Sequence, residues 1–288
     1  MTWAAYQVTF RLLSPVHIGW HKLGNLQQTR PYITGRNVWG ALTARLTRQN
    51  ENDNYKVIGE RVDAQLAFTY FYPSTKQDTV ELWPWRDERD KWDMFAWTFL
   101  GSYASTALED GRGAKAGSLH ETEFIAPKTR DGESVYLVGY FFTKDTCQLL
   151  WENALGKLQL GGERGYGWGR VELVRLQKFE EVNPVICFGY EFKGEQAYPL
   201  LQAPKAPEAG EASEASKKDV RLLAHTYADD ADDARGTIEP LIGRETTGST
   251  SFGKSISRAE ICWTPGSKAR AEEKFYVQQK GIWRRVVN

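Results

Sequence analysis

The residues best suited to chemistry lie in a glycine-rich stretch at positions 160–171 (LGGERGYGWGRV). Glycine adopts positive φ and lets a ligand approach the backbone, arginine forks match phosphate oxygens, and exposed aromatic rings offer faces on which bases stack. The stretch therefore predicts a loop that binds a polyanion, with RNA as the favoured ligand. The alternative is a turn that only closes a hairpin. The loop residues expected to contact RNA are Gly161, Gly162, Arg164, Gly165, Tyr166, Gly167 and Arg170.

A second expected anion site precedes the first predicted helix. Apolar residues recur at helical spacing from position 38 to position 46, and Thr34 or Asn37 is suited to cap the helix. The free backbone N–H groups of the first turn, with Gly35 and Arg36 beside them, form an anion site. An ordinary strand–loop–helix unit with no ligand is the alternative.

Three residues are candidates for catalysis, although we expect a protein that binds RNA without cutting it. A metal-independent ribonuclease needs a general base and a general acid, and His17 and His21 lie in a loop that could approach RNA. His17 stands between two apolar residues, so a packed, hydrogen-bonded histidine is the alternative. Asp110, in a predicted long loop at 102–119, could position a 2′-OH or a metal ion; otherwise residues 109–111 are simply a turn.

No metal or cofactor is expected. Cys147, Cys187 and Cys262 lie far apart without CxxC or zinc spacing, and no HExxH, GxSxG or Walker sequence is present. The N-terminus lacks a signal-peptide pattern, and no stretch approaches the roughly 18 apolar residues of a membrane span. We therefore expect a soluble, cytoplasmic protein without a membrane partner. Its 37 basic and 37 acidic residues imply that an RNA-binding form concentrates positive charge on one face or shares its ligand with other subunits.

The elements that would position these residues follow a strand, helix, strands, helix, strand order up to about residue 180. This order indicates an α+β chain with a ferredoxin-like (RRM-like) domain over 1–180, whose sheet often binds single-stranded RNA on its open face. A smaller, mainly β part is expected over 181–288, with mobile insertions near 203–218 and 226–236. Strands are predicted at 3–13, 64–72, 79–85, 120–126, 134–143, 168–176, 185–193, 257–263 and 273–287, and helices at 37–48, 87–101 and 145–157.

Four stretches together resemble the RAMP superfamily of CRISPR-associated proteins. They are residues 14–19 (SPVHIG), 30–42 (RPYITGRNVWGAL), 121–125 (ETEFI) and the glycine-rich stretch, which ends in WGRV. The family's "SP-hIG" element, its "YIPGSSLRGAL" turn and its glycine-rich loop stand in this order. Thr34 replaces the usual proline of the turn, and Arg36 and Asn37 replace two serines. The resemblance covers about residues 3–176.

The resemblance implies an RRM-like core in a subunit of a type III crRNA-guided effector complex, with crRNA and other effector subunits as partners. It implies that the guide lies along the glycine loop and the turn before the first helix, and adds to the expected RNA contacts His17, Lys22, Arg30, Gly35, Arg36 and Asn37.

Among the roles known in this family, a cap on the 5′ repeat-derived handle is the most similar. The alternatives are a backbone subunit that positions or cuts target RNA with a loop aspartate, and a metal-independent endoribonuclease that makes the guide. Outside this family, a ferredoxin-like metabolic enzyme could bind a phosphate or nucleotide through the same loop.

Overall fold

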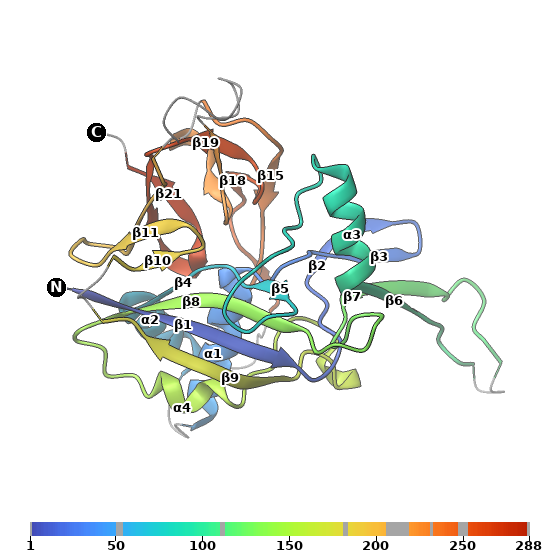
Figure 1. Ribbon diagram of the computed structural model, residues 1–288. Coiled ribbons are helices and arrows are strands. Elements are labelled where there is room, and N and C mark those ends of the chain that lie inside the picture. The colour runs from blue at the N-terminus through green and yellow to red at the C-terminus, as the bar shows by residue number, and fades with distance from the viewer. Residues whose placement is uncertain are drawn as a thin grey trace.

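Five antiparallel strands form the sheet around which the first 180 residues are arranged (Figure 1). The computed structural model describes residues 2–49, 54–109, 113–180, 184–205, 219–230, 233–246 and 253–286. The sheet has the order β4-β8-β1-β9, and β5 also pairs with β8. These strands are β1 (Trp3–Leu12), β4 (Leu66–Phe68), β5 (Tyr72–Ser74), β8 (Tyr136–Lys144) and β9 (Val171–Lys178).

One face of this sheet packs against helices because apolar residues alternate along its strands. Val8, Phe10 and Leu12 of β1 contact the apolar side of α1 (Gly35–Gln49), on which Val38 and Leu42 are fully buried. Successive strand residues point to opposite faces, and helical residues four apart share one side, so the two patterns meet in one core. The same core includes α2 (Tyr55–Gln65), α4 (Trp151–Leu155) and part of α3 (Arg89–Phe99).

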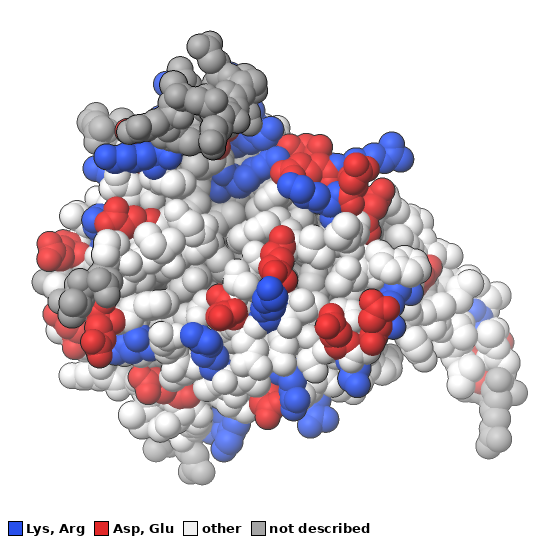
Figure 2. Space-filling view, in the orientation of Figure 1, with Lys and Arg blue, Asp and Glu red and all other residues white. Residues whose placement is uncertain are grey.

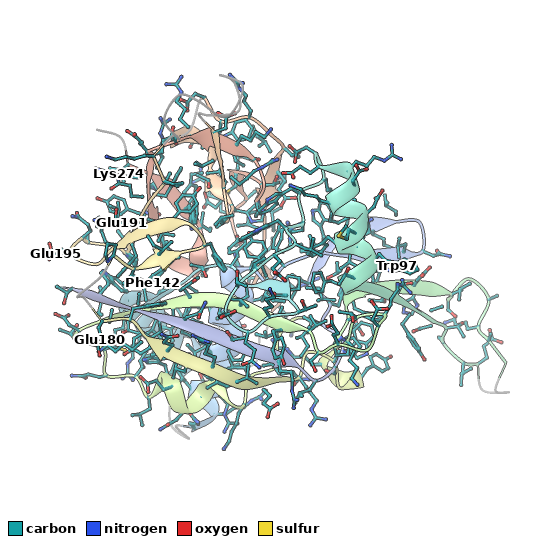
Figure 3. The ribbon with its side chains drawn as sticks, in the orientation of Figure 1. Trp97, Phe142, Glu180, Glu191, Glu195 and Lys274 are labelled. Atoms are coloured by element: carbon teal, nitrogen blue, oxygen red, sulfur yellow. The ribbon has the colours of Figure 1, made fainter. Side chains whose placement is uncertain are left out.

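The opposite face of the sheet is covered, so it does not offer the open surface expected for RNA. Val138, Tyr140 and Phe142 of β8 join a second core that includes strands of the C-terminal part. Phe142, labelled in Figure 3, stacks on Phe192 with ring centroids 4.8 Å apart. Because these side chains are already buried against protein, no base can stack there without separating the two parts.

The C-terminal part is built from strands and short 3-10 helices in the residues that the structure describes. Its main sheet has the order β10-β11-β12-β20-β21-β14-β18-β15, and two smaller pairs, β13 with β19 and β16 with β17, lie beside it. The elements are β10 (Ile186–Cys187), β11 (Tyr190–Lys193), β12 (Leu200–Gln202), β13 (Asp219–Arg221), β14 (Thr226–Tyr227), η2 (Ala228–Asp230), β15 (Ile238–Leu241), β16 (Arg244–Glu245), β17 (Ser255–Ile256), β18 (Glu260–Trp263), β19 (Lys268–Arg270), β20 (Lys274–Val277), η3 (Gln279–Gly281) and β21 (Trp283–Arg285).

A four-stranded sheet, β2-β3-β7-β6, extends from the first part, and its β6–β7 hairpin projects as an arm (Figure 1). Its strands are β2 (Gly19–Leu23), β3 (Leu26–Thr29), β6 (Leu100–Ser105) and β7 (His120–Ile125). The predicted loop at 102–119 is therefore partly wrong, because β6 continues to Ser105 and Leu108 bridges to Ala114. Cross-strand pairing to β7 orders a stretch whose composition alone indicates a loop.

Other predicted elements differ from the structure for local reasons. Residues 79–85 form no strand; Trp83 and Trp85 instead stack on each other at 5.4 Å, with Pro84 between them unable to donate a ladder hydrogen bond. The helix predicted at 145–157 shrinks to α4. The strands predicted at 185–193 and 273–287 are each a hairpin, since the backbone reverses at positive φ, the first at Phe188 and the second at Lys280.

The helix α2 was not predicted from the sequence. Most of the insertion expected near 203–218 lies outside the described residues, which omit 206–218. The insertion expected near 226–236 begins with β14 of the main sheet, and only its residues 231–232 lie outside the described residues.

Candidate RNA-binding interface

The glycine loop docks on the 14–18 segment through backbone hydrogen bonds. The Gly169 N–H donates to the Pro15 carbonyl at 2.7 Å, and the Gly162 N–H donates to the His17 carbonyl at 2.9 Å. The Arg170 N–H donates to the Ser14 hydroxyl at 2.9 Å. Two stretches about 150 positions apart in the sequence therefore form one surface.

Glycine is required at two of the docking positions. A Cβ atom on Gly161 would lie 2.4 Å from the His17 carbonyl oxygen, and one on Gly169 would lie 2.0 Å from the Leu160 carbonyl oxygen; both residues have positive φ. Gly167 also has positive φ, at +81°, but its surroundings are open, and Gly165 is open on all sides. The close approach thus explains Gly161 and Gly169, and the turn geometry explains Gly167.

The loop presents side chains to solvent around the 3-10 turn η1 (Arg164–Tyr166). Tyr166 is 84% exposed, and Arg164 and Arg170 are also exposed. Arg164 donates from Nε to the Gly161 carbonyl at 2.9 Å, which leaves the outer edge of its guanidinium free to contact an anion. Trp168 faces inward and packs edge-on against Phe124 at 5.2 Å.

The catalytic candidates are not assembled into an active site among the described residues. His17 is only 7% exposed, and its Nδ1 lies 2.7 Å from the Glu123 carbonyl oxygen, so its ring links the loop segment to β7. His21 is exposed, and its ring lies 4.3 Å from that of Trp20 in a tilted arrangement. Asp110 lies outside the described residues. The environment of His17 matches the packed alternative.

The turn before α1 is covered by the C-terminal part. Thr34 accepts a hydrogen bond from the Asn37 N–H at 3.3 Å, as a helix cap does. A Cβ on Gly35 would lie 2.6 Å from the Lys280 carbonyl oxygen, so η3 passes directly over the first turn. Arg36 forms an ion pair with Glu245 at 3.2 Å, and Lys280 approaches the same carboxylate at 3.7 Å.

Charged side chains of the glycine loop and of the turn before α1 both act on Tyr55 of α2. Burial raises the pKa of Tyr55, while the nearby charges of Arg164 and Arg36 oppose that rise. Burial also raises the pKa of Asp63 to about 6, against the charges of Lys280 and Arg36. The guanidiniums of the two predicted anion sites therefore lie within electrostatic range of a single side chain. We call Arg36, Tyr55, Asp63, Arg164 and Lys280 the α1 cluster.

The sequence analysis did not predict α2, and for that reason it did not identify Tyr55 and Asp63 as site residues. A signal was present in the sequence, since Tyr55, Ile58 and Val62 follow helical spacing after Asn54. The Asn54 side chain accepts from the Lys56 N–H at 2.8 Å and caps the helix. Lys280 carries no local signal, because its place over α1 depends on a contact with Gly35, about 240 positions away in the sequence.

Two predicted contacts, Arg30 and Lys22, lie outside the α1 cluster. The Arg30 side chain is 11% exposed, with its Nη1 2.5 Å from Glu239 Oε1, and the same oxygen lies 2.5 Å from His225 Nε2. His225 Nδ1 lies 2.7 Å from the Tyr70 hydroxyl. Lys22 is exposed on the β2–β3 hairpin.

The buried network around Arg30 links the first part to the C-terminal part. Burial lowers the pKa of His225 to about 4, so its neutral ring donates to Glu239 and accepts from Tyr70. Burial opposes ionisation of Glu239, but the hydrogen bond with His225 and the charge of Arg30 outweigh it and lower the Glu239 pKa to about 2. The Arg30 charge is therefore compensated within the protein.

Charged residues of both signs are mixed on the visible face of the molecule. Figure 2 shows acidic and basic residues interspersed there, without one wide basic field. Among the residues that the structure describes, no three His, Cys, Asp or Glu side chains gather as a metal site. None of the described helices is long and apolar enough to cross a membrane.

Comparison with solved structures gives a match over most of the chain. A chain of the Type III-B Cmr-beta bound to cognate target RNA and AMPPnP is 12% identical, with a TM-score of 0.51; the alignment covers 92% of this chain and 86% of that chain. A chain of the Type III-B Cmr-beta bound to cognate target RNA is 10% identical, with a TM-score of 0.38, and the alignment covers 60% of this chain and 96% of that chain. Only the first similarity bears on the fold.

Comparison with curated proteins gave no match. The model of the RAMP superfamily matches residues 9–172, more than half of the sequence, and this range includes the 14–18 segment, α1, α2 and the glycine loop. The chain belongs to the RAMP superfamily.

Proposed function

We propose that this chain is a non-catalytic subunit of a type III CRISPR effector complex that binds crRNA, most closely as a cap on its 5′ repeat-derived handle. The observation that carries the proposal is the glycine loop, which backbone hydrogen bonds dock on the 14–18 segment and which presents Arg164, Tyr166 and Arg170 to solvent. Family membership and the fold similarity to a Type III-B Cmr-beta chain support it. In this function the subunit acts in the cytoplasm, together with the other subunits of its complex.

The topology supports a ferredoxin-like (RRM-like) first domain over residues 1–180. Its four strand positions in chain order are β1, β4 with β5, β8 and β9, and they lie in the spatial order β4-β8-β1-β9. Helices connect the first strand to the second and the third to the fourth, as in a βαββαβ unit. We assign residues 181–288 to a second domain that closes the sheet face and places Lys280 over α1.

RNA would lie across the glycine loop and the α1 cluster rather than on the sheet. Arg164, Arg170 and Lys280 would contact phosphates, and the exposed Tyr166 ring would stack on a base. Ordered backbone at Gly161 and Gly169 positions these groups before RNA arrives, which lowers the entropic cost of binding.

The test is binding of labelled RNA to the purified full-length chain. The double variant Arg164→Ala, Arg170→Ala is expected to weaken binding of a repeat-derived RNA by about 100-fold or more, since charge-assisted hydrogen bonds contribute about 1.5–3 kcal/mol each, or about 3–6 kcal/mol together. The slope of log affinity against log salt should fall by about 0.7 for each phosphate that the variant no longer neutralises.

The matched control removes two exposed charges elsewhere, Arg89→Ala with Lys274→Ala (Lys274 is labelled in Figure 3), and should retain the wild-type affinity. Equal affinity for the loop variant and the control would refute the proposal. A metabolic enzyme that binds only a small phosphate ligand should ignore the repeat-derived RNA altogether.

The projecting β6–β7 arm favours a second candidate function, that of a backbone subunit which contacts target RNA. Asp110 lies between its two strands in the sequence, outside the described residues. If this function holds, Asp110→Ala should abolish cleavage of a complementary target by the assembled complex while its crRNA content stays unchanged. Persistent cleavage would remove the candidate.

A further inference from the structure

A cleft of about 1320 Å³ separates the first part from the C-terminal part and shares no residue with the glycine loop or the α1 cluster. One wall comes from β2 and from residues 84–88 before α3; the other comes from β13, β15 and residues 264–268. Its volume exceeds the 300–1,000 Å³ that is common for small-molecule pockets, so it suits a segment of a polymer.

A single arginine dominates the first wall. The Arg86 guanidinium lies between two indole rings, 4.5 Å from the centroid of Trp20 and 4.3 Å from that of Trp92. It forms no hydrogen bond or ion pair within the described residues, although the charge of the Glu123 carboxylate acts on it. The two rings contact the guanidinium, and its N–H groups are not bonded to another described residue, so they can bind an anion.

Most carboxylates of the cleft are already paired. Asp87 and Glu88 both bind Arg221, at 2.9 and 2.7 Å, and Glu239 binds Arg30. On the second wall, Arg235 is exposed, and its side chain has no partner of opposite charge in the part of the chain that the structure describes. Asp219 is the one carboxylate of the cleft that also lacks an ion pair there. Within the cleft, two guanidiniums therefore lack an ion pair, as does one carboxylate, while Glu123 outside the cleft acts on Arg86 through its charge.

The cleft also presents a pair of aromatic rings. The rings of Trp20 and His21 are tilted against each other, with centroids 4.3 Å apart and planes inclined by 37°. His21 is exposed, so its outer face is open to a ligand ring. Trp85 and Tyr32, both buried, form the floor.

We propose that this cleft binds a short segment of single-stranded RNA, separately from the glycine loop. Phosphates bind Arg86 and Arg235, and a base stacks on His21 above Trp20. A peptide strand is disfavoured because β15 is the edge strand of the main sheet and carries Pro240, which has no N–H to offer an added strand. This site does not depend on the function proposed for the glycine loop.

The experiment uses the full-length chain with Arg164→Ala and Arg170→Ala, so that the glycine loop does not contribute. The probe is a uridine tetranucleotide that carries one 5-iodouridine and a fluorescent label. Arg86→Gln in this background is expected to lower affinity for the probe about tenfold and the salt slope by about 0.7. Irradiation should cross-link the probe to the peptide that contains Trp20 and His21. Lys274→Ala, the charge control, should leave both readouts unchanged.

Several results would overturn the inference. They are unchanged probe affinity in Arg86→Gln, cross-links confined to peptides outside the cleft, or displacement of the probe by a peptide ligand but not by unlabelled RNA. Arg235→Gln provides a second test, because this exposed side chain has little role in folding; the same loss of affinity is expected, with an unchanged melting temperature. If the glycine-loop variant loses repeat-derived RNA but still binds the probe in the cleft, the cleft inference stands and the result bears only on the function proposed for the glycine loop.

Discussion

Alanine substitutions at three neighbouring glycines should have effects of different sign and size. Gly165 lies in the 3-10 turn with open space around it and without positive φ. Gly165→Ala should therefore be neutral or stabilise the protein by about 0.4–1 kcal/mol, through the lower entropy of the unfolded chain. Gly167→Ala places a Cβ at φ +81° in open space, which should cost about 1–2 kcal/mol.

Gly169→Ala should be the most destabilising of the three. It carries the same backbone cost at φ +82°, and its Cβ would lie 2.0 Å from the Leu160 carbonyl oxygen. Relief of that overlap must break the hydrogen bonds from Gly169 to Pro15 and from Leu160 to Gly169, at 2.7 and 2.8 Å. At about 0.5–1.5 kcal/mol for each bond, the total reaches about 2–5 kcal/mol.

The assay is urea unfolding of the wild type and the three variants, with binding of repeat-derived RNA measured in parallel. The expected order of stability is Gly165→Ala, wild type, Gly167→Ala, Gly169→Ala. If Gly169→Ala unfolds at the same urea concentration as Gly165→Ala, the loop is not docked on the 14–18 segment and the reasoning fails. RNA binding should fall in Gly169→Ala and persist in Gly165→Ala.

Other predictions concern stacking, the buried network and acid stability. Tyr166→Ala should cost about 1–3 kcal/mol of RNA affinity at an unchanged melting temperature, whereas Trp168→Ala should mainly lower the melting temperature; the reverse pattern would contradict the assigned orientations. Glu239→Gln leaves a buried guanidinium uncompensated and should destabilise the fold by about 3–5 kcal/mol in urea; a cost below about 1 kcal/mol would argue against the pair. Asp63 has a folded pKa of about 6, above its ordinary 3.8, so its ionisation destabilises the fold as pH rises through that window. Asp63→Asn should be about 1–2 kcal/mol more stable at pH 7, and equal stability would exclude the shift. In this variant, stability should fall as pH drops from 6.5 to about 4, since His225 stays neutral in the fold and protonates in the unfolded chain; a flat profile there would refute the burial of a neutral ring.

The glycine positions, the β1 alternation and the α1 spacing were readable from the sequence because each reflects a local rule. Positive φ selects glycine at 161, 167 and 169, and the orientation of Tyr166 follows from its place at the tip of a short turn. Helix α2 also obeyed a local rule, through Asn54 and its helical spacing. The prediction of a strand at 79–85 was wrong because a run of aromatic residues also occurs in buried segments that pair with no strand, as around Pro84.

The sequence by itself determined the order of the motifs, the RAMP resemblance and the residues able to bind a phosphate. Only the tertiary structure decided which cations remain available. Arg30 is neutralised by Glu239, 209 positions away, Arg36 is partly compensated by Glu245, and Arg86 forms no ion pair among the described residues and lies against two indoles. Ion pairing and burial depend on contacts between residues distant in the sequence, and the C-terminal strands that make these contacts also cover the sheet face that local patterns had left open.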